Sequence, residues 1–416
     1  SFFHEGYKSG TLHLSSSDVV VNDTVWNVSQ GSNIYIKNNK VSFNDIGLYS
    51  NNQYIGISGF FPNTSKDTLN LNFRKLNISN FDILLASSIG VDVDGVINGN
   101  LQVSGIKDKI AILSDLDILD VGINEHAVGD AYIDANWNAA DTSMFVDTKI
   151  VREDTNDTLM TLVGNYYTMR KYNDLDFGLY LNDMDISVVN AFAKGVLSKV
   201  EGELRGDFRI NGSLKKPVLT GEAILRNGAC NIDYLNTYYR VNPDGYGSSF
   251  KPYIKSYENR IELSDIILVD TANNYAVASG YITHDYFKDF DFNIDAVLNN
   301  FIAMNMPEKD NASFYGTAVA SGDLKINGPL DDIKMDINAL TMPGTVIDIG
   351  LTSTSSLNDR FIIFVNNDIA QDTVEMLLPE IKKDKKFTFN LNADITSDAS
   401  LNIVLPSDMG NINASG

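Results

Sequence analysis

One short pattern of alternating residues occurs three times in this chain and limits what the chain can fold into. Each copy reads glycine, polar, apolar, polar, apolar, polar, glycine, and the copies span residues 99–105, 206–212 and 322–328. They start 107 and 116 residues apart. Successive side chains of a β-strand point to opposite faces of a sheet. Each copy therefore predicts a strand with one polar face and one apolar face, and both glycines lie on the apolar face.

The segments around the three copies also repeat. An alternating strand precedes each copy, at residues 69–73, 177–181 and 292–296, and we expect a short helix in between, at 79–90, 186–199 and 300–310. The predicted divisions are the end of a preceding repeat (1–68), three repeats (69–176, 177–290 and 291–386) and the start of a further repeat (387–416). A repeat array stacks its units edge to edge, so we expect one continuous elongated body.

The predicted fold class is all-β: an elongated antiparallel sheet, built from repeats and curled into an apolar groove, with short helices at the repeat starts. The alternation around each motif continues for about 12–16 residues, roughly twice the usual length of a strand. A sheet of many such strands twists and curls instead of staying flat. An apolar face on the inside of that curl makes a trough.

The candidate binding surface is the apolar face of the motif strands. Its predicted residues are Val91, Val93, Ile97, Leu101 and Val103 in the first copy, Leu204, Phe208, Ile210 and Leu214 in the second, and Leu324, Ile326 and Leu330 in the third. The glycines of the motif share this face, and we interpret them as points where a strand bends or another group approaches its backbone: Gly99, Gly105, Gly206, Gly212, Gly322 and Gly328.

The charge of the chain limits its partners. The sequence contains 32 Lys and Arg residues against 54 Asp and Glu residues, a formal net charge of −22. Such a chain repels phosphate backbones and anionic membrane surfaces at long range. We therefore expect no nucleic-acid partner, and we interpret the excess of acidic residues as a solvated outer face.

The sequence offers no motif for catalysis. The four histidines are scattered, and we find no zinc-protease, nucleophile-elbow or phosphate-loop motif. Cys230 is the single cysteine, which excludes an intrachain disulfide and a cysteine metal cluster. The prediction is a protein that is not an enzyme, with no cofactor and no metal. No apolar run reaches the roughly 20 residues that span a bilayer, so we expect any membrane anchor to lie outside this sequence, which reads as an internal to C-terminal fragment.

A family resemblance is carried by residues 202–241, GELRGDFRINGSLKKPVLTGEAILRNGACNIDYLNTYYRV. This stretch resembles the repeat of the TamB family, within the AsmA-like group of bridge-like lipid carriers, and so do residues 23–59 and 398–416. The likeness looks closest to the members from Bacteroidota. The third motif departs from the second because Pro329 directly follows its last glycine, which leaves the hairpin register there open.

The resemblance implies a location and partners. It implies a periplasmic segment of an inner-membrane-anchored protein in a diderm bacterium, together with an outer-membrane barrel protein of the translocation and assembly module (TamA- or TamL-like). It also implies phospholipid as the cargo, conducted between the inner and outer membranes in support of outer-membrane biogenesis.

Alternatives remain open at this point. Acyl tails lie against the apolar face in one interpretation, whereas in the other the same residues pack against each other as a closed sandwich core. A different function is a chaperone for outer-membrane β-barrel proteins, in which an exposed strand edge pairs with a barrel strand. A β-solenoid fibre is disfavoured, because its coils repeat every two dozen residues or so and the period here exceeds one hundred.

Overall fold

The computed structural model describes residues 9–415 apart from 16, 39, 65, 82–91, 107–108, 125, 139, 171, 192, 194–195, 244–252, 312–313, 351–385 and 405–410. The described residues form 26 strands, two single-turn 3₁₀ segments and no α-helix. They divide into two compact units. Unit 1 comprises residues 1–234, 238–268 and 283–288, and unit 2 comprises 235–237, 269–282 and 289–416. The repeat boundaries expected from the sequence stay a prediction.

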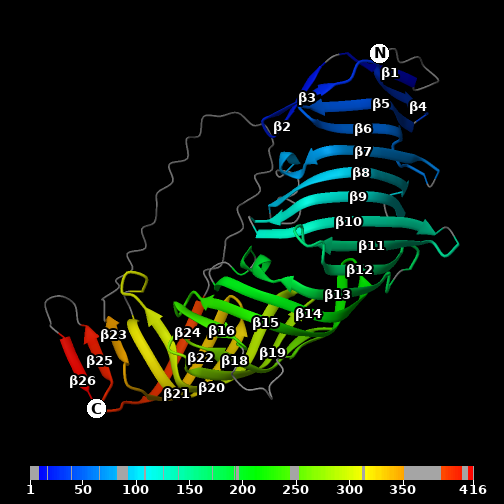
Figure 1. Ribbon diagram of the computed structural model, residues 1–416. Helices are drawn as coiled ribbons and strands as arrows, with labels where there is room; N and C mark the ends of the chain where they lie inside the picture. The colour runs from blue at the N-terminus through cyan, green and yellow to red at the C-terminus, as the bar shows by residue number, and fades with distance from the viewer. Residues whose placement is uncertain are drawn as a thin grey trace, which may run out of the picture. The chain divides into compact units, whose positions relative to one another are not determined.

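Unit 1 is a ladder of antiparallel strands in which chain order and spatial order agree from β4 to β15 (Figure 1). Its elements are β1 Ser9–Leu14, β2 Asp18–Val21, β3 Thr24–Val28, β4 Ser32–Lys37, β5 Lys40–Ser50, β6 Gln53–Phe60, β7 Thr68–Asn77, η1 Ile78–Phe81, β8 Val93–Ile106, β9 Lys109–Ile123, β10 His126–Asn138, β11 Ser143–Val151, β12 Thr158–Tyr167, β13 Leu175–Asp185, η2 Ser187–Ala191, β14 Leu197–Ser213, β15 Lys216–Ile232, β16 Thr237–Val241, β17 Tyr253–Tyr257 and β18 Arg260–Val269. From β4 to β15 every strand pairs with the next one, and β15 then pairs with β17 and β17 with β18. Near the start of the chain, β1 pairs with β4, β2 with β3, and β3 with β5.

Unit 2 contains the last strands: β19 Tyr275–Asp285, β20 Lys288–Met306, β21 Phe314–Pro329, β22 Asp332–Thr341, β23 Val346–Gly350, β24 Lys386–Asp394, β25 Ser400–Val404 and β26 Asn411–Ser415. Antiparallel pairs join β20 to β21, β21 to β22 and to β23, and β25 to β26. Two pairs are parallel, β22 with β24 and β23 with β25, so the sheet is mixed where we expected antiparallel pairing throughout. A parallel pair needs a connection of about a dozen residues or more, and residues 351–385 separate β23 from β24.

The three motifs occupy the long strands that the alternation predicts. Strands β8, β14 and β21 contain 14, 17 and 16 residues. In the first two copies the preceding strand aligns in the same way, with Phe73 of β7 opposite Gly99 and Leu181 of β13 opposite Gly206. In the third copy the register differs by two residues, because Leu298 of β20 lies opposite Gly322.

The prediction of short helices at the repeat starts is wrong. The first two are the 3₁₀ turns η1 and η2, of four and five residues, although most of 79–90 lies outside the described residues. In the third copy β20 continues to Met306, with register shifts between Leu298 and Phe301 and between Ile302 and Met304. Each bulge adds a residue to one strand, so Leu298, Phe301 and Met304 come three apart, the spacing of a helix, although all three are buried from a strand.

Bulges also bend the strands of unit 1. In β7, Lys75 has a φ of 49° at the register shift between Phe73 and Leu76, and in β8, Gly95 has a φ of 149° at the shift next to it. In β14, Lys199 and Gly202 likewise lie at register shifts, with φ of 50° and 135°. A bulge bends its strand and increases the local twist. The curl expected from strand length is therefore set at particular residues.

The motif glycines let neighbouring strands approach closely. A Cβ on Gly99, whose φ is 115°, would lie 2.1 Å from the carbonyl oxygen of Asp115 in β9, and one on Gly322 would lie 2.2 Å from that of Asn338 in β22. Gly206 is as tight, with the Glu222 oxygen at 2.4 Å. The last glycine of each motif has a positive φ one residue before its strand ends: Gly105, Gly212 and Gly328.

We predict that Gly99→Ala destabilises the protein by more than about 1 kcal/mol, because an added Cβ meets backbone and the positive φ disfavours an L side chain. Gly122→Ala in β9 is the matched control, since the nearest atom to its Cβ would be at an ordinary 3.5 Å. Thermal unfolding followed by circular dichroism measures both. Equal melting temperatures for the two variants would contradict the close-approach role.

Candidate functional site

Two rows of side chains without charge run across unit 1 on one face of the sheet. Residues directly opposite each other in an antiparallel pair point to the same face. The first row consists of Leu48, Ile55, Phe73, Gly99, Leu116, Ile133, Thr148, Leu162, Leu179, Phe208 and Gly221, and the second of Ile46, Ile57, Leu71, Leu101, Ser114, Ala135, Val146, Gly164, Phe177, Ile210 and Leu219. We call this surface the apolar face. It is continuous over eleven strands, from β5 to β15.

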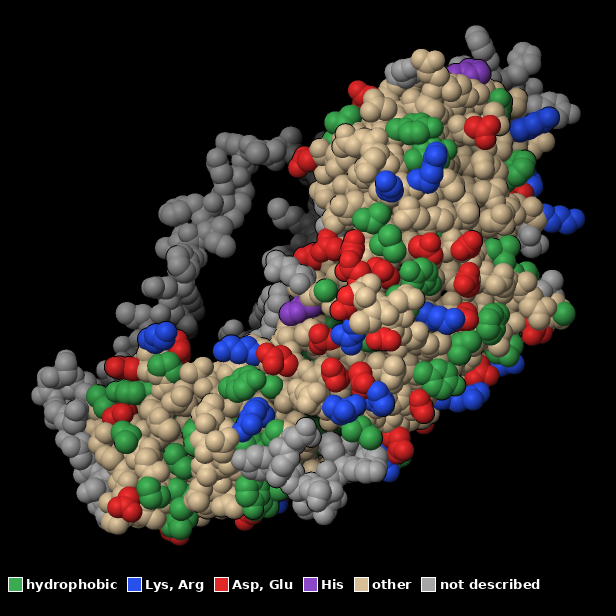
Figure 2. Space-filling model, in the orientation of Figure 1, with side chains coloured by type: hydrophobic (Ala, Val, Ile, Leu, Met, Phe, Trp, Pro, Cys, Tyr) green, Lys and Arg blue, Asp and Glu red, His purple; other side chains and the backbone are tan. Residues whose placement is uncertain are grey.

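The other face of the same sheet is polar. Asn100, Asp115, Asp134 and Asp147 are successive opposite neighbours from β8 to β11. Figure 2 shows acidic side chains gathered over β8–β10. Like charges opposite each other repel, and exposure to water and salt weakens that repulsion. The sheet therefore has one wet, acidic face and one face from which charge is absent.

Most side chains of the apolar face are half-buried. Leu101, Leu162 and Ile210 each keep part of their surface accessible. Phe177 and Phe208 are more covered, at 8% and 9% exposed, and the ring of Phe208 lies beside Gly221, where a Cβ would be 2.8 Å from Cδ1 of the ring. In the described part of unit 1 the main strand contacts join ladder neighbours, and η2 lies against β14 and β10. Coverage of the face comes from its own neighbours more than from a second layer.

The predicted site residues fall into three groups: those within strands, one outside the described residues, and two beyond strand ends. The strand β8 contains Val93, Ile97, Leu101 and Val103, the strand β14 contains Leu204, Phe208 and Ile210, and the strand β21 of unit 2 contains Leu324 and Ile326. Val91 lies outside the described residues. Leu214 and Leu330 come after the ends of β14 and β21, where they are 65% and 37% exposed.

A tryptophan covers the apolar face at β5–β7. Trp26 of β3 is 1% exposed and forms a buried cluster with Ile55 and Leu76, against which Val21, Leu48, Ile57, Phe73 and Ile97 pack. The β2–β3 hairpin that carries it is attached to η1, because Nδ2 of Asn22 donates to the Ser79 carbonyl at 3.2 Å and Oγ1 of Thr24 to Oδ1 of Asn80 at 3.1 Å. This contact was not predicted from the sequence, because it joins segments more than 50 residues apart.

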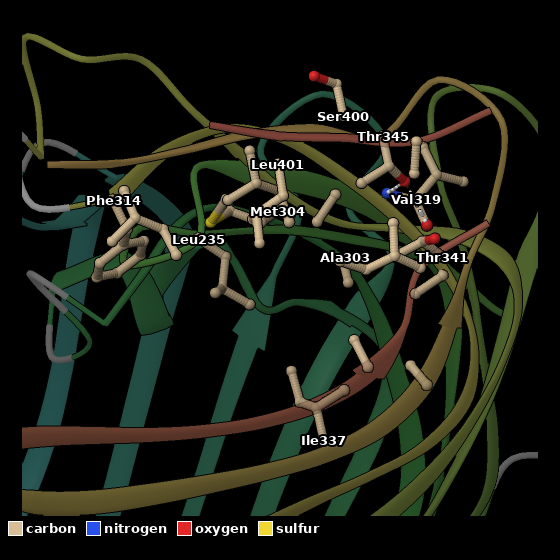
Figure 3. A pocket seen from close by; sticks show the side chains of 18 residues that line it. Leu235, Ala303, Met304, Phe314, Val319, Ile337, Thr341, Thr345, Ser400 and Leu401 are labelled. Carbon is tan, nitrogen blue, oxygen red and sulfur yellow. Dashed lines mark hydrogen bonds between the residues drawn. The ribbon is translucent and has the colours of Figure 1, made fainter. Parts of the chain in front are cut away.

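Unit 2 contains an apolar pocket of about 550 Å³ (Figure 3). It is lined by Leu235, Ala303, Met304, Phe314, Ala318, Val319, Ala320, Ile337, Ala339, Thr341, Thr345, Ile347, Ile349, Ala393, Ile395, Ala399, Ser400 and Leu401. No lining residue is charged. Figure 3 shows Leu235, Met304 and Leu401 together on one side, with Phe314 beside them and Ile337 across the space.

The pocket lies where breaks in neighbouring strands coincide. β22 stops at Thr341 and β23 resumes the pairing with β21 from Val346, while beside them β24 stops at Asp394 and β25 starts at Ser400. Hydrogen bonds fix the two corners. The Thr396 amide donates to Oγ1 of Thr341 at 2.9 Å, and the Ser400 amide donates to the Thr345 carbonyl at 2.9 Å.

One wall of the pocket comes from a distant part of the sequence. Leu235, 6% exposed, belongs to a three-residue segment of unit 2. Its carbonyl accepts from the Asn305 amide at 3.0 Å, and Nδ2 of Asn236 donates to the Asn305 carbonyl at 2.9 Å. None of the lining residues is among the predicted site residues, although the alternation of the third motif strand places Phe314, Ala318 and Ala320 on its apolar face. The alternate alanines Ala318 and Ala320 were the one available signal, since small residues on an apolar face leave volume.

The described residues hold neither a metal cluster nor a membrane-spanning helix. No group of three or more His, Cys, Asp or Glu side chains among them is arranged to hold a metal ion. None of the helical segments in the described part of the chain has the length and apolarity to cross a bilayer.

The fold and the two surfaces define a class: an almost wholly β protein, with long bent strands and one uncharged face. A family model, the TamB C-terminal domain, matches residues 264–416. Residues 264–416 are accordingly similar to the C-terminal domain of TamB-type proteins. Neither the curated proteins nor the solved structures include a match to it.

TamB-type proteins act in outer-membrane biogenesis as a transport or assembly family without enzymatic activity. They span the periplasm from an inner-membrane anchor and associate with a TamA-type partner.

The single cysteine gives a test of packing in β15. Burial raises the pKa of the Cys230 thiol from its ordinary 9.0 to about 11. We predict slow alkylation by iodoacetamide at pH 8, with a rate that rises toward pH 11, because the thiolate is the nucleophile. The unfolded chain loses this proton first, so the thiol lowers folding stability progressively between about pH 9 and 11.

The same chain in denaturant is the control, and no other thiol contributes to the signal. Native and denatured protein alkylated at the same rate at pH 8 would show that the thiol is not shielded.

Proposed function

We propose that this chain is a periplasmic segment of a carrier that conducts phospholipid acyl chains between the inner and outer membranes along the apolar face. The tails lie against residues such as Leu101 and Ile210, and the headgroups stay in water outside the curl. The single observation that supports this most strongly is the pair of uncharged rows of opposite residues, which continue from β9 to β15 beyond the cluster around Trp26.

The free energy of transferring a lipid tail favours weak binding along the whole face over tight binding at one position. Burying acyl surface is worth about 0.8 kcal/mol per methylene, so a lipid tail leaves water readily for such a face. Relative to a bilayer the gain is small, because both environments are hydrocarbon. Leu, Ile, Val and Phe make up most of both rows, with small residues such as Gly99 and Ser114 between them and no charge, so a tail meets apolar surroundings at each strand. A tail bound in this way slides along the face.

Half-burial supports the open arrangement over a closed sandwich. The inner residues of a two-layer core are fully covered by the opposing layer. Leu101, Leu162 and Ile210 instead keep accessible surface. The face therefore has room for a guest.

A second candidate function is the chaperone for outer-membrane barrel strands. In the described residues β1 pairs on one side only, with β4, and its Leu12 is 54% exposed. Unpaired edges of this kind add strands by main-chain hydrogen bonds. A TamA- or TamL-like barrel partner suits either function, and the two are compatible in one protein.

We predict that Leu101→Asp abolishes lipid binding and leaves the fold intact, because a carboxylate interrupts the apolar row at a half-buried position. Gln102→Asp is the matched control, one residue away on the exposed polar face. The measurements are mass spectrometry of lipid extracted from detergent-free protein and circular dichroism. Phe208→Glu extends the test to β14. Global unfolding of Leu101→Asp, with Gln102→Asp intact, would support the closed core instead.

Tryptophan fluorescence offers an independent test. The chain has two tryptophans: Trp26 is sealed, whereas Trp137, opposite Met144, shares the parity of Ala135 on the apolar face and is half-buried. We predict that vesicles of phosphatidylcholine brominated on the acyl chains quench Trp137, and quench Trp26 much less. The variants Trp26→Phe and Trp137→Phe separate the two signals. Absence of quenching at Trp137 would argue against the lipid path.

A further inference from the structure

We propose that the pocket of unit 2 is a holding site for one linear alkyl chain of a lipid, whose polar head stays outside. This inference rests on the proposed function and deepens it. Unit 1 offers lipid tails an extended apolar face, and unit 2 adds a discrete binding site for one tail. The argument depends on the chemistry of the wall, its volume and its rigidity.

The wall accepts hydrocarbon and offers little to polar groups. Three of the 18 lining residues are polar, and each has its hydroxyl engaged. Oγ1 of Thr345 donates to the carbonyl of Val319 at 2.7 Å or of Met342 at 2.8 Å and accepts from the Val319 amide at 3.1 Å.

The other two hydroxyls are likewise occupied. Oγ1 of Thr341 accepts from the Thr396 amide at 2.9 Å and lies 3.3 Å from the Asp394 carbonyl oxygen, and Oγ of Ser400 donates to Oδ1 of Asn402 at 3.2 Å. Water inside an apolar space needs two to four polar partners, as does a headgroup of comparable polarity. The occupant that fits this wall is an alkyl chain.

Small side chains create the volume. Six of the lining residues are alanines: Ala303, Ala318, Ala320, Ala339, Ala393 and Ala399. Across the sheet, Leu298, Gly322, Ala339 and Ala393 are successive opposite neighbours, so the row loses bulk from β20 to β24. In the two rows of unit 1 small residues come at most two in succession, as Ser114 and Ala135 do, whereas Gly322, Ala339 and Ala393 are three. A volume of about 550 Å³ lies within the range of small-molecule sites, roughly 300–1,000 Å³.

The pocket is rigid enough to retain a guest. Its corners are fixed by the hydrogen bonds between Thr341 and Thr396 and between Thr345 and Ser400, and Leu235 closes one side through its contacts with Asn305. An alkyl chain in this site touches side chains of β20 to β25 and also Leu235, which comes from outside these strands, whereas a chain on the apolar face of unit 1 touches neighbouring strands of the ladder. More contact on a preformed surface slows dissociation.

The test uses the full chain with both tryptophans replaced by phenylalanine and one reporter, Phe314→Trp, in the pocket wall. The probe is a vesicle of acyl-brominated phosphatidylcholine, followed by dilution into unbrominated vesicles. We expect quenching of the reporter, and recovery on dilution that is several-fold slower than for Trp137 in the Trp26→Phe chain. Ile395→Trp, at a lining residue that is 39% exposed, is a second reporter that keeps the test valid if Phe314→Trp does not fold.

A filling variant tests the volume. Ala339→Leu adds bulk inside the pocket and should reduce quenching of the reporter several-fold. Leu340→Phe adds bulk to the next residue, which is 45% exposed and does not line the pocket, and should leave quenching unchanged.

The outcomes separate the two proposals. An unquenched reporter, equal quenching in Ala339→Leu, or recovery as fast as at Trp137 overturns the holding site, while quenching at Trp137 keeps the lipid path. No quenching at either tryptophan overturns both proposals.

Discussion

The alternation of apolar and polar residues along single-layer strands is the constraint on which the remaining structure depends. Such a sheet must expose one polar face to water and shield the other, yet its apolar side chains stay half-buried, as Leu101 and Ile210 do. Because apolar surface in water is unfavourable, the strands bend at bulges such as Lys75 and Gly95 and bring their side chains closer together. Acidic residues such as Asp115 and Asp134 lie on the outer, polar face. The curl of the sheet, the distribution of its charges and its capacity to bind an apolar ligand all follow from the two-residue alternation of the strands.

The long motif strands were predictable because alternation is a local signal. Residues 99–105 predicted a strand with the face that β8 has, and the pairing of Phe73 with Gly99 follows from strands adjacent in sequence. The parallel pairs were not predictable, because the residues of β24 do not indicate whether the strand runs parallel or antiparallel to β22. The predicted helix at 300–310 was wrong because bulges gave Leu298, Phe301 and Met304 a helical spacing.

The candidate site was predictable only in part, for a related reason. Parity placed Leu101, Phe208 and Leu324 within strands, but parity alone does not show where a strand ends, and Leu214 and Leu330 lie beyond those ends. The pocket depends on breaks in β22/β23 and β24/β25 coming side by side. That alignment is a property of tertiary register, which no short window of sequence contains. The same is true of Leu235, which joins unit 2 from another part of the chain.

The cluster around Trp26 has a consequence for access. Side chains of the β2–β3 hairpin already occupy the inner surface of β5–β7, so this stretch is dry and filled by the protein itself. A guest of unit 1 has no end-on route along that stretch while the hairpin stays in place. On the proposed function, a lipid tail therefore reaches the apolar face from the side, across the strand ends beyond this stretch, and not along the sheet past β5–β7.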